Sequence, residues 1–133
     1  MFNLVKIENG RMNVPEPEYF DAKASTEIQV GQALALQNGV LAPVGGTTKP
    51  EFISLAKLPT SAAKREIPVA RVNDEQVYEV SVTAAPTSLK VGSKVTISSD
   101  GTEVTATTTD GVATIVNLKG AAAEGDKILV KFV

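Results

Sequence analysis

The side chains that most often carry enzyme chemistry are scarce in this chain of 133 residues. It contains no His and no Cys, so the commonest general base and every thiolate nucleophile or metal ligand are missing. Acyl transfer needs a nucleophile beside a base, and Ser61 with Lys64 is a conceivable Ser–Lys pair. Nothing around this pair would bury and activate the lysine, so we expect a solvated loop there.

Paired carboxylates could serve glycoside hydrolysis, and two pairs are close in the sequence. Glu16 and Glu18 belong to a proline-rich segment, and Asp74 and Glu75 belong to a turn. Both settings indicate solvated charge rather than a general acid placed beside a nucleophile.

The glycine motifs also lack the features of ligand-binding sites. Asp100-Gly101 and Asp110-Gly111 lack the staggered oxygen ligands of an EF-hand loop and are typical of turns. Gly45-Gly46 lacks the pattern and the following helix that would direct backbone amides at a phosphate. We therefore expect no enzyme activity, no cofactor and no metal site.

Charge and composition restrict the partners. Thirteen basic and 15 acidic residues give a net charge of -2 without a basic stripe, so we expect no nucleic-acid partner. No apolar run is long enough to span a bilayer, and we expect no membrane partner. The first residues lack the long apolar core of a signal peptide, which predicts synthesis in a cytoplasm.

The elements that would position any site are predicted to be short strands. Turn signals recur about every 8 to 12 residues, which is typical of a β-sandwich or β-barrel. Asn38-Gly39 between apolar runs predicts a tight hairpin, and residues 77–82 alternate with the period of a strand. A Thr-rich hairpin is predicted over residues 95–116, with a polar surface that either pairs with another chain or faces water.

The N-terminal segment differs from the rest and is predicted to be an extended arm, residues 1–25, followed by a β domain, residues 26–133. Prolines at alternate positions, Pro15 and Pro17, favour an extended backbone. The segment carries six large apolar side chains: Phe2, Leu4, Val5, Ile7, Tyr19 and Phe20. Two interpretations are open, namely an edge strand packed on its own domain and an arm that lies on a neighbouring subunit.

Residues 30–44, from Val30-Gly31-Gln32 to Ala42-Pro43-Val44, resemble the opening hairpin of tailed-bacteriophage capsid decoration (cement) proteins. The strand at residues 50–55 and the Val- and Gly-rich segments 67–82 and 89–97 are similar to the later strands of that family. The resemblance implies an all-β fold, a small β-barrel or β-tulip-like domain with an extended N-terminal arm.

The same resemblance implies a role on the virion. Such proteins bind the outer surface of the phage head, often as homotrimers, and stabilise contacts between major capsid protein subunits. The six apolar residues of the arm are then the expected capsid or subunit contacts. The alternatives are another virion structural module of a tail or baseplate, an immunoglobulin-like adhesion domain, or an enzyme or carbohydrate-binding module.

Overall fold

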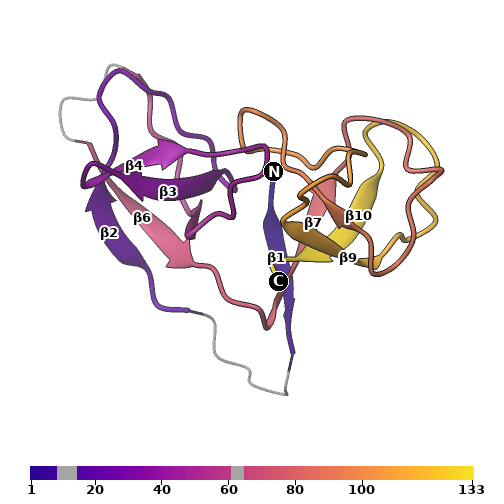
Figure 1. Cartoon of the computed structure of the whole chain (residues 1–133). Helices are drawn as coiled ribbons and strands as arrows, with labels where there is room; N and C mark the ends of the chain where they lie inside the picture. The colour runs from indigo at the N-terminus through magenta and orange to yellow at the C-terminus, as the bar shows by residue number, and fades with distance from the viewer. Residues whose placement is uncertain (9–14, 61–64) are drawn as a thin grey trace.

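The computed structural model describes residues 1–8, 15–60 and 65–133, and these residues form two five-stranded antiparallel sheets and no helix. Sheet A has the order β1 (Asn3–Ile7), β7 (Gln76–Ser81), β10 (Lys127–Lys131), β9 (Ala113–Asn117) and β8 (Lys94–Val95). Sheet B has the order β2 (Glu18–Asp21), β6 (Glu66–Arg71), β5 (Phe52–Ser54), β3 (Ala33–Gln37) and β4 (Val40–Pro43). The two sheets lie side by side with β1 between them (Figure 1). The all-β prediction is confirmed, and the sheets do not close into a barrel.

The predicted tight hairpin joins β3 to β4. Asn38 and Gly39 have φ angles of 52° and 82°, and Gln37 pairs with Val40 across the turn. Two central residues with positive φ are the signature of the turn that matches the twist of the flanking strands. The local sequence therefore determined this part of sheet B.

Sheet B curves around its own apolar core. Leu34, Leu41 and Phe52 are fully buried in it. The guanidinium carbon of Arg71 lies 4.8 Å from the centre of the Phe52 ring, which adds a cation–π contact. A parallel bridge between Ala22 and Leu41 brings the chain after β2 beside β4, but strand pairing does not continue from there.

A second apolar cluster fills one side of sheet A. Tyr78 and Phe132 are buried at its centre, with ring centroids 5.6 Å apart. The Tyr78 hydroxyl donates a 2.6 Å hydrogen bond to Gln76 Oε1, and burial raises the pKa of Tyr78 above its ordinary value. Ala33 and Ile53 of sheet B belong to the same cluster, so the two sheets share this core.

The Thr-rich segment 95–116 contains the antiparallel pairing of the predicted hairpin. β8 pairs with β9, Ile97 forms an antiparallel bridge with Val104, and the Ser98 N–H donates a 2.9 Å hydrogen bond to the Glu103 carbonyl. Its ends lie in β8 and β9, and Ile97 between them forms a bridge with Gly46 of the loop after β4. A Cβ atom on Gly45 would lie 2.0 Å from the Ser98 carbonyl oxygen, so the two loops pack backbone against backbone. The segment thus combines the local pairing that threonine favours with contacts to a distant loop.

Candidate protein-interaction surfaces

The predicted arm residues lie in the two edge strands β1 and β2. Phe2, Leu4, Val5 and Ile7 belong to β1 or precede it, and Tyr19 and Phe20 belong to β2. β1 pairs with β7, and β2 pairs with β6, as in the first of the two interpretations of the segment. The apolar residues of β1 therefore lie together on sheet A, whereas those of β2 lie on sheet B.

Only part of this set is accessible to a partner. Phe2 is buried, and Leu4 and Phe20 are partly buried against the two cores. Val5 is exposed, and 60% of Tyr19 is exposed. Contact of these residues with a capsid stays a prediction.

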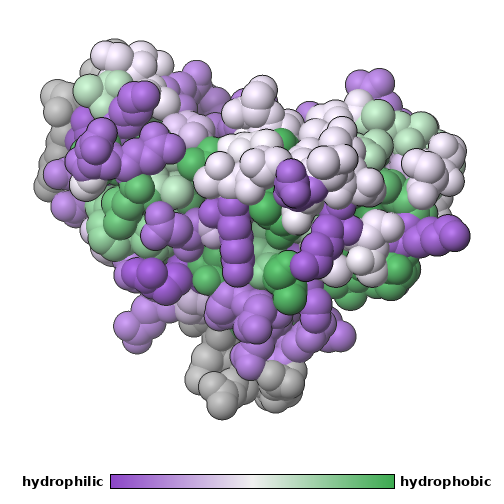
Figure 2. Space-filling view, viewed as in Figure 1, coloured by the Kyte–Doolittle hydropathy of each residue, from purple (hydrophilic) through white to green (hydrophobic). Residues whose placement is uncertain are grey.

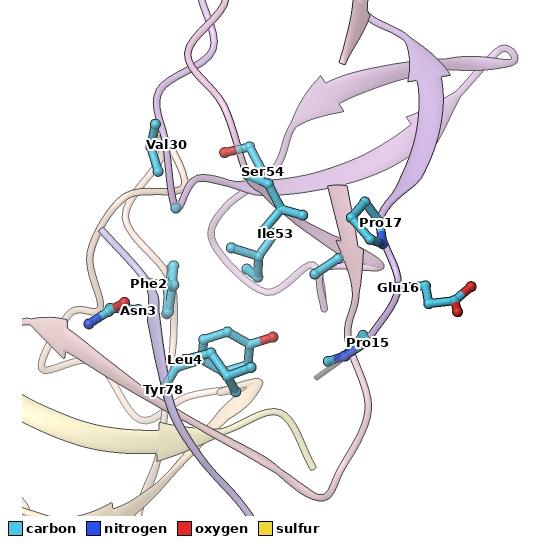
Figure 3. Close-up of a pocket in the computed structure, with 13 residues that line it drawn as sticks. Phe2, Asn3, Leu4, Pro15, Glu16, Pro17, Val30, Ile53, Ser54 and Tyr78 are labelled. Carbon is cyan, nitrogen blue, oxygen red and sulfur yellow. The ribbon is translucent and has the colours of Figure 1, made fainter. Parts of the chain in front are cut away.

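A groove of about 610 Å³ separates β1 from the strands of sheet B, and Figure 3 shows its lining side chains. Most of its lining is apolar, including Leu4, Pro17, Val30, Ile53 and Leu55. Val30 is 53% exposed and Leu55 is 44% exposed, so two large apolar side chains at this groove face solvent. Figure 2 shows hydrophobic surface in the middle of the molecule, bordered by hydrophilic side chains. A concave apolar surface of this kind is better suited to binding a protein segment than to catalysing a reaction.

One end of the groove is fixed by a close approach of backbones. The Phe2 N–H donates a 2.7 Å hydrogen bond to the Gly31 carbonyl, and the Gly31 N–H donates to the Ser54 carbonyl at 2.9 Å. Gly31 has a φ of 77°, and a Cβ atom there would lie 2.7 Å from the Phe2 carbonyl oxygen. The Ser54 hydroxyl accepts from the Gln32 N–H at 2.9 Å and donates to the Gln29 carbonyl. This network holds β1 against sheet B.

The remaining length of β1 offers a strand edge. β1 is the outermost strand of sheet A, so within the described ranges it has a strand neighbour on one side only. Leu4 on β1 lines the groove, which places the groove beside this edge. An extended segment lying there would add main-chain hydrogen bonds to apolar contacts.

A second hollow, of about 530 Å³, shares Phe2, Asn3, Val30 and Gly31 with the groove and has a more polar lining. Its lining includes Met1, Val30, Glu79 and Lys127. A 2.5 Å hydrogen bond from Lys119 Nζ lowers the pKa of Glu79 below its ordinary value. Burial lowers the pKa of the Met1 amino group.

The carboxylates considered for catalysis have other roles or settings. Glu18 forms a two-point ion pair with Arg71, with distances of 2.8 and 2.9 Å, and this hydrogen bonding lowers the pKa of Glu18. The hydrogen bond from the Ser98 hydroxyl lowers the pKa of Asp100, which forms a turn as predicted. Ser61 and Lys64 lie outside the described residues.

Two absences apply to the part of the chain that the structure describes. There, no three His, Cys, Asp or Glu side chains are grouped so that they could hold a metal ion. Nor do these residues contain a helix that is long and apolar enough to cross a membrane.

Comparisons with known proteins bear on the fold. No protein-family model matches the chain, and no curated protein matches its sequence. The structure is similar to the crystal structure of the N base of head fiber gp8.5 of bacteriophage phi29, with a TM-score of 0.59 and 17% sequence identity. The match covers 89% of this chain and 95% of that chain. At this identity the likeness establishes that the two chains share a fold.

Proposed function

We propose that this chain is a structural protein of a bacteriophage virion with no catalytic role. More specifically, we propose a capsid decoration (cement) protein that binds the outer surface of the head as a homotrimer and ties major capsid protein subunits together. The observation that carries this proposal is the fold shared with the phi29 head fiber base over nearly the whole length of both chains. The resemblance of residues 30–44 to decoration proteins points to the same particle surface.

The apolar groove beside β1 supplies the proposed capsid contact. Val30 and Leu55 expose large apolar surfaces at this groove, and β1 has an edge without a strand partner in the described part of the chain. An extended segment of the major capsid protein would bury these side chains and add a strand beside β1. Among the described residues that line the groove, Glu16 is the only charged one, which favours an uncharged segment.

The test is binding to phage heads purified without this protein. Leu55→Lys should weaken binding about 30-fold, because burying a leucine contributes roughly 2 kcal/mol to such a contact. Val91→Lys is the matched control, since Val91 is 64% exposed and does not line the groove. Co-sedimentation would measure both variants. Wild-type protein that leaves such heads bare would refute the decoration role.

A second candidate is the base of a head fibre. The phi29 chain that shares this fold is such a base, and the match covers 95% of it. Electron microscopy of decorated heads separates the two roles: a decoration protein gives low protrusions, whereas a fibre base carries a long projection.

A further inference from the structure

The outer face of sheet A, opposite its core, carries a row of lysines. Lys6 on β1 pairs with Val77 on β7, and the pairing of β7 with β10 brings Val77 beside Lys131. Thr114 on β9 pairs with Lys131 on one side and with Lys94 of β8 on the other. One row therefore crosses all five strands, with lysines at every second position. With neighbouring strands about 4.8 Å apart, each lysine of the row lies roughly 10 Å from the next.

The lysines of this face are only partly paired with carboxylates. Lys119 and Lys127 interact with Glu79 at 2.5 and 3.8 Å, Lys131 interacts with Glu8 at 3.5 Å, and Glu103 accepts from a hydroxyl at the end of β7. The five lysines of this face outnumber the three glutamates that contact them or β7, in a chain whose net charge is -2. Within the described ranges, the two ends of the row, Lys6 and Lys94, form no ion pair.

A complementary surface lies on the outside of sheet B. Asp21 on β2 pairs with Glu66 on β6, so two exposed carboxylates face each other directly across the strands. Like charges in this position are destabilising in isolation. Neither carboxylate forms an ion pair with another described residue. On the same side of these strands Tyr19 pairs with Pro68, which adds an exposed aromatic ring beside the acidic pair.

We propose that the lysine row of one copy binds the Asp21–Glu66 pair of a second copy of this chain. The two surfaces lie on different sheets, so the contact is head-to-tail, and it closes into a ring when the rotation between copies allows it. A ring of three copies is the assembly required by the proposed decoration function, on which this inference rests.

Charge complementarity favours a second copy over nucleic acid as the occupant. The acidic surface is present on the chain itself, whereas the lysines are 10 Å apart and interrupted by Val77 and Thr114 in a chain of net charge -2. The carboxylate pair also gains from the contact, because lysines from a neighbour relieve the repulsion between Asp21 and Glu66.

The experiment compares charge-reversed variants by sedimentation velocity without phage heads, at low and high ionic strength. Lys6→Glu with Lys94→Glu, and separately Asp21→Lys with Glu66→Lys, should each raise the dissociation constant of the oligomer at least about a hundredfold. High salt should weaken the wild-type oligomer as well. The variant with all four reversals should assemble again, because the two unpaired ends of the row and the carboxylate pair then have exchanged signs, while Lys131 keeps its ion pair with Glu8.

Two further outcomes decide the proposal. The fourfold variant should form no mixed oligomers with wild type, since each mixed contact places like charges together. Lys49→Glu with Lys90→Glu, two exposed lysines outside the row, is the control and should leave assembly unchanged. The proposal is overturned by a wild-type monomer, by an oligomer indifferent to the reversals, or by a fourfold variant that folds but stays monomeric. Duplex DNA bound through the lysine row with unchanged self-association would also overturn it. Head binding is measured separately, so a failure here leaves the decoration role to its own test.

Discussion

Replacing Phe2 with Ala tests whether the N-terminal strand is part of the folded domain. Phe2 is 3% exposed, and its ring centroid lies 5.2 Å from that of Phe132 and 6.3 Å from that of Tyr78. Truncating a phenylalanine that is buried in this way to alanine lowers the free energy of unfolding by about 3–5 kcal/mol. Because the groove lies beside Phe2, its neighbours can move into part of the space, and we expect the lower end, about 3 kcal/mol. The Phe2 N–H bond to Gly31 is retained by alanine and does not add to this figure.

Urea denaturation measures the effect. With a slope near 2 kcal/mol/M, a loss of about 3 kcal/mol lowers the unfolding midpoint by about 1.5 M. Val5→Ala, at an exposed position on the adjoining strand β1, is the control and should change the free energy of unfolding by less than about 0.5 kcal/mol. If Phe2→Ala left the midpoint within the range of this control, β1 would not be docked as described.

Two other predictions concern the backbone and the core. Gly101 and Gly39 both have positive φ, but a Cβ atom on Gly101 would lie 2.6 Å from a backbone oxygen, whereas nothing lies within 4 Å of one on Gly39. Thermal unfolding should therefore show a clearly larger loss of stability for Gly101→Ala than for Gly39→Ala. The Gly39→Ala substitution costs about 1 kcal/mol through backbone strain alone. Equal losses of stability in the two variants would contradict the close packing at Gly101. Burial raises the pKa of Tyr78 above its ordinary value of 10.0, so the stability linked to this phenol is present below pH 10.0 and is lost as the pH rises further. In a Tyr19→Phe variant, phenolate absorbance should appear together with alkaline unfolding, and a phenolate in the intact fold would refute the burial.

Local features of the sequence predicted local structure well. Asn38-Gly39 forms its hairpin because both φ angles are set by those two residues. The extended backbone expected around Pro15 and Pro17 leads directly into β2, which begins at Glu18. These features depend on dihedral preferences that act over two or three residues, and no distant partner is needed to specify them.

Contacts between distant segments could not be predicted in the same way. Threonine content predicted the hairpin at residues 95–116, but it did not predict that Gly45 lets a loop from the other sheet pack directly against this segment. The exposure of Val30 and Leu55 is decided by the gap between two sheets, whereas their sequence neighbourhoods resemble those of core residues. The lysine row depends on the registers of five strands, which place Lys6 and Lys94 at the two ends of one row although they come from distant parts of the chain.

The position of β1 in the chain explains why its residues suggested an arm, and it decides how its function must be tested. β1 pairs with β7, so the whole of sheet B lies between the two partners in the sequence. Strand partners so far apart leave no local signal, and an apolar segment before a proline-rich stretch then resembles a free arm. In the structure β1 completes sheet A, lines the groove through Leu4 and begins the lysine row at Lys6. Deleting it would remove a core aromatic residue, a groove wall and a charged contact together, so loss of head binding would not identify the cause. Substitutions at exposed positions, Leu55 for the groove and Lys6 for the row, perturb one surface at a time and leave the core that Phe2 completes intact.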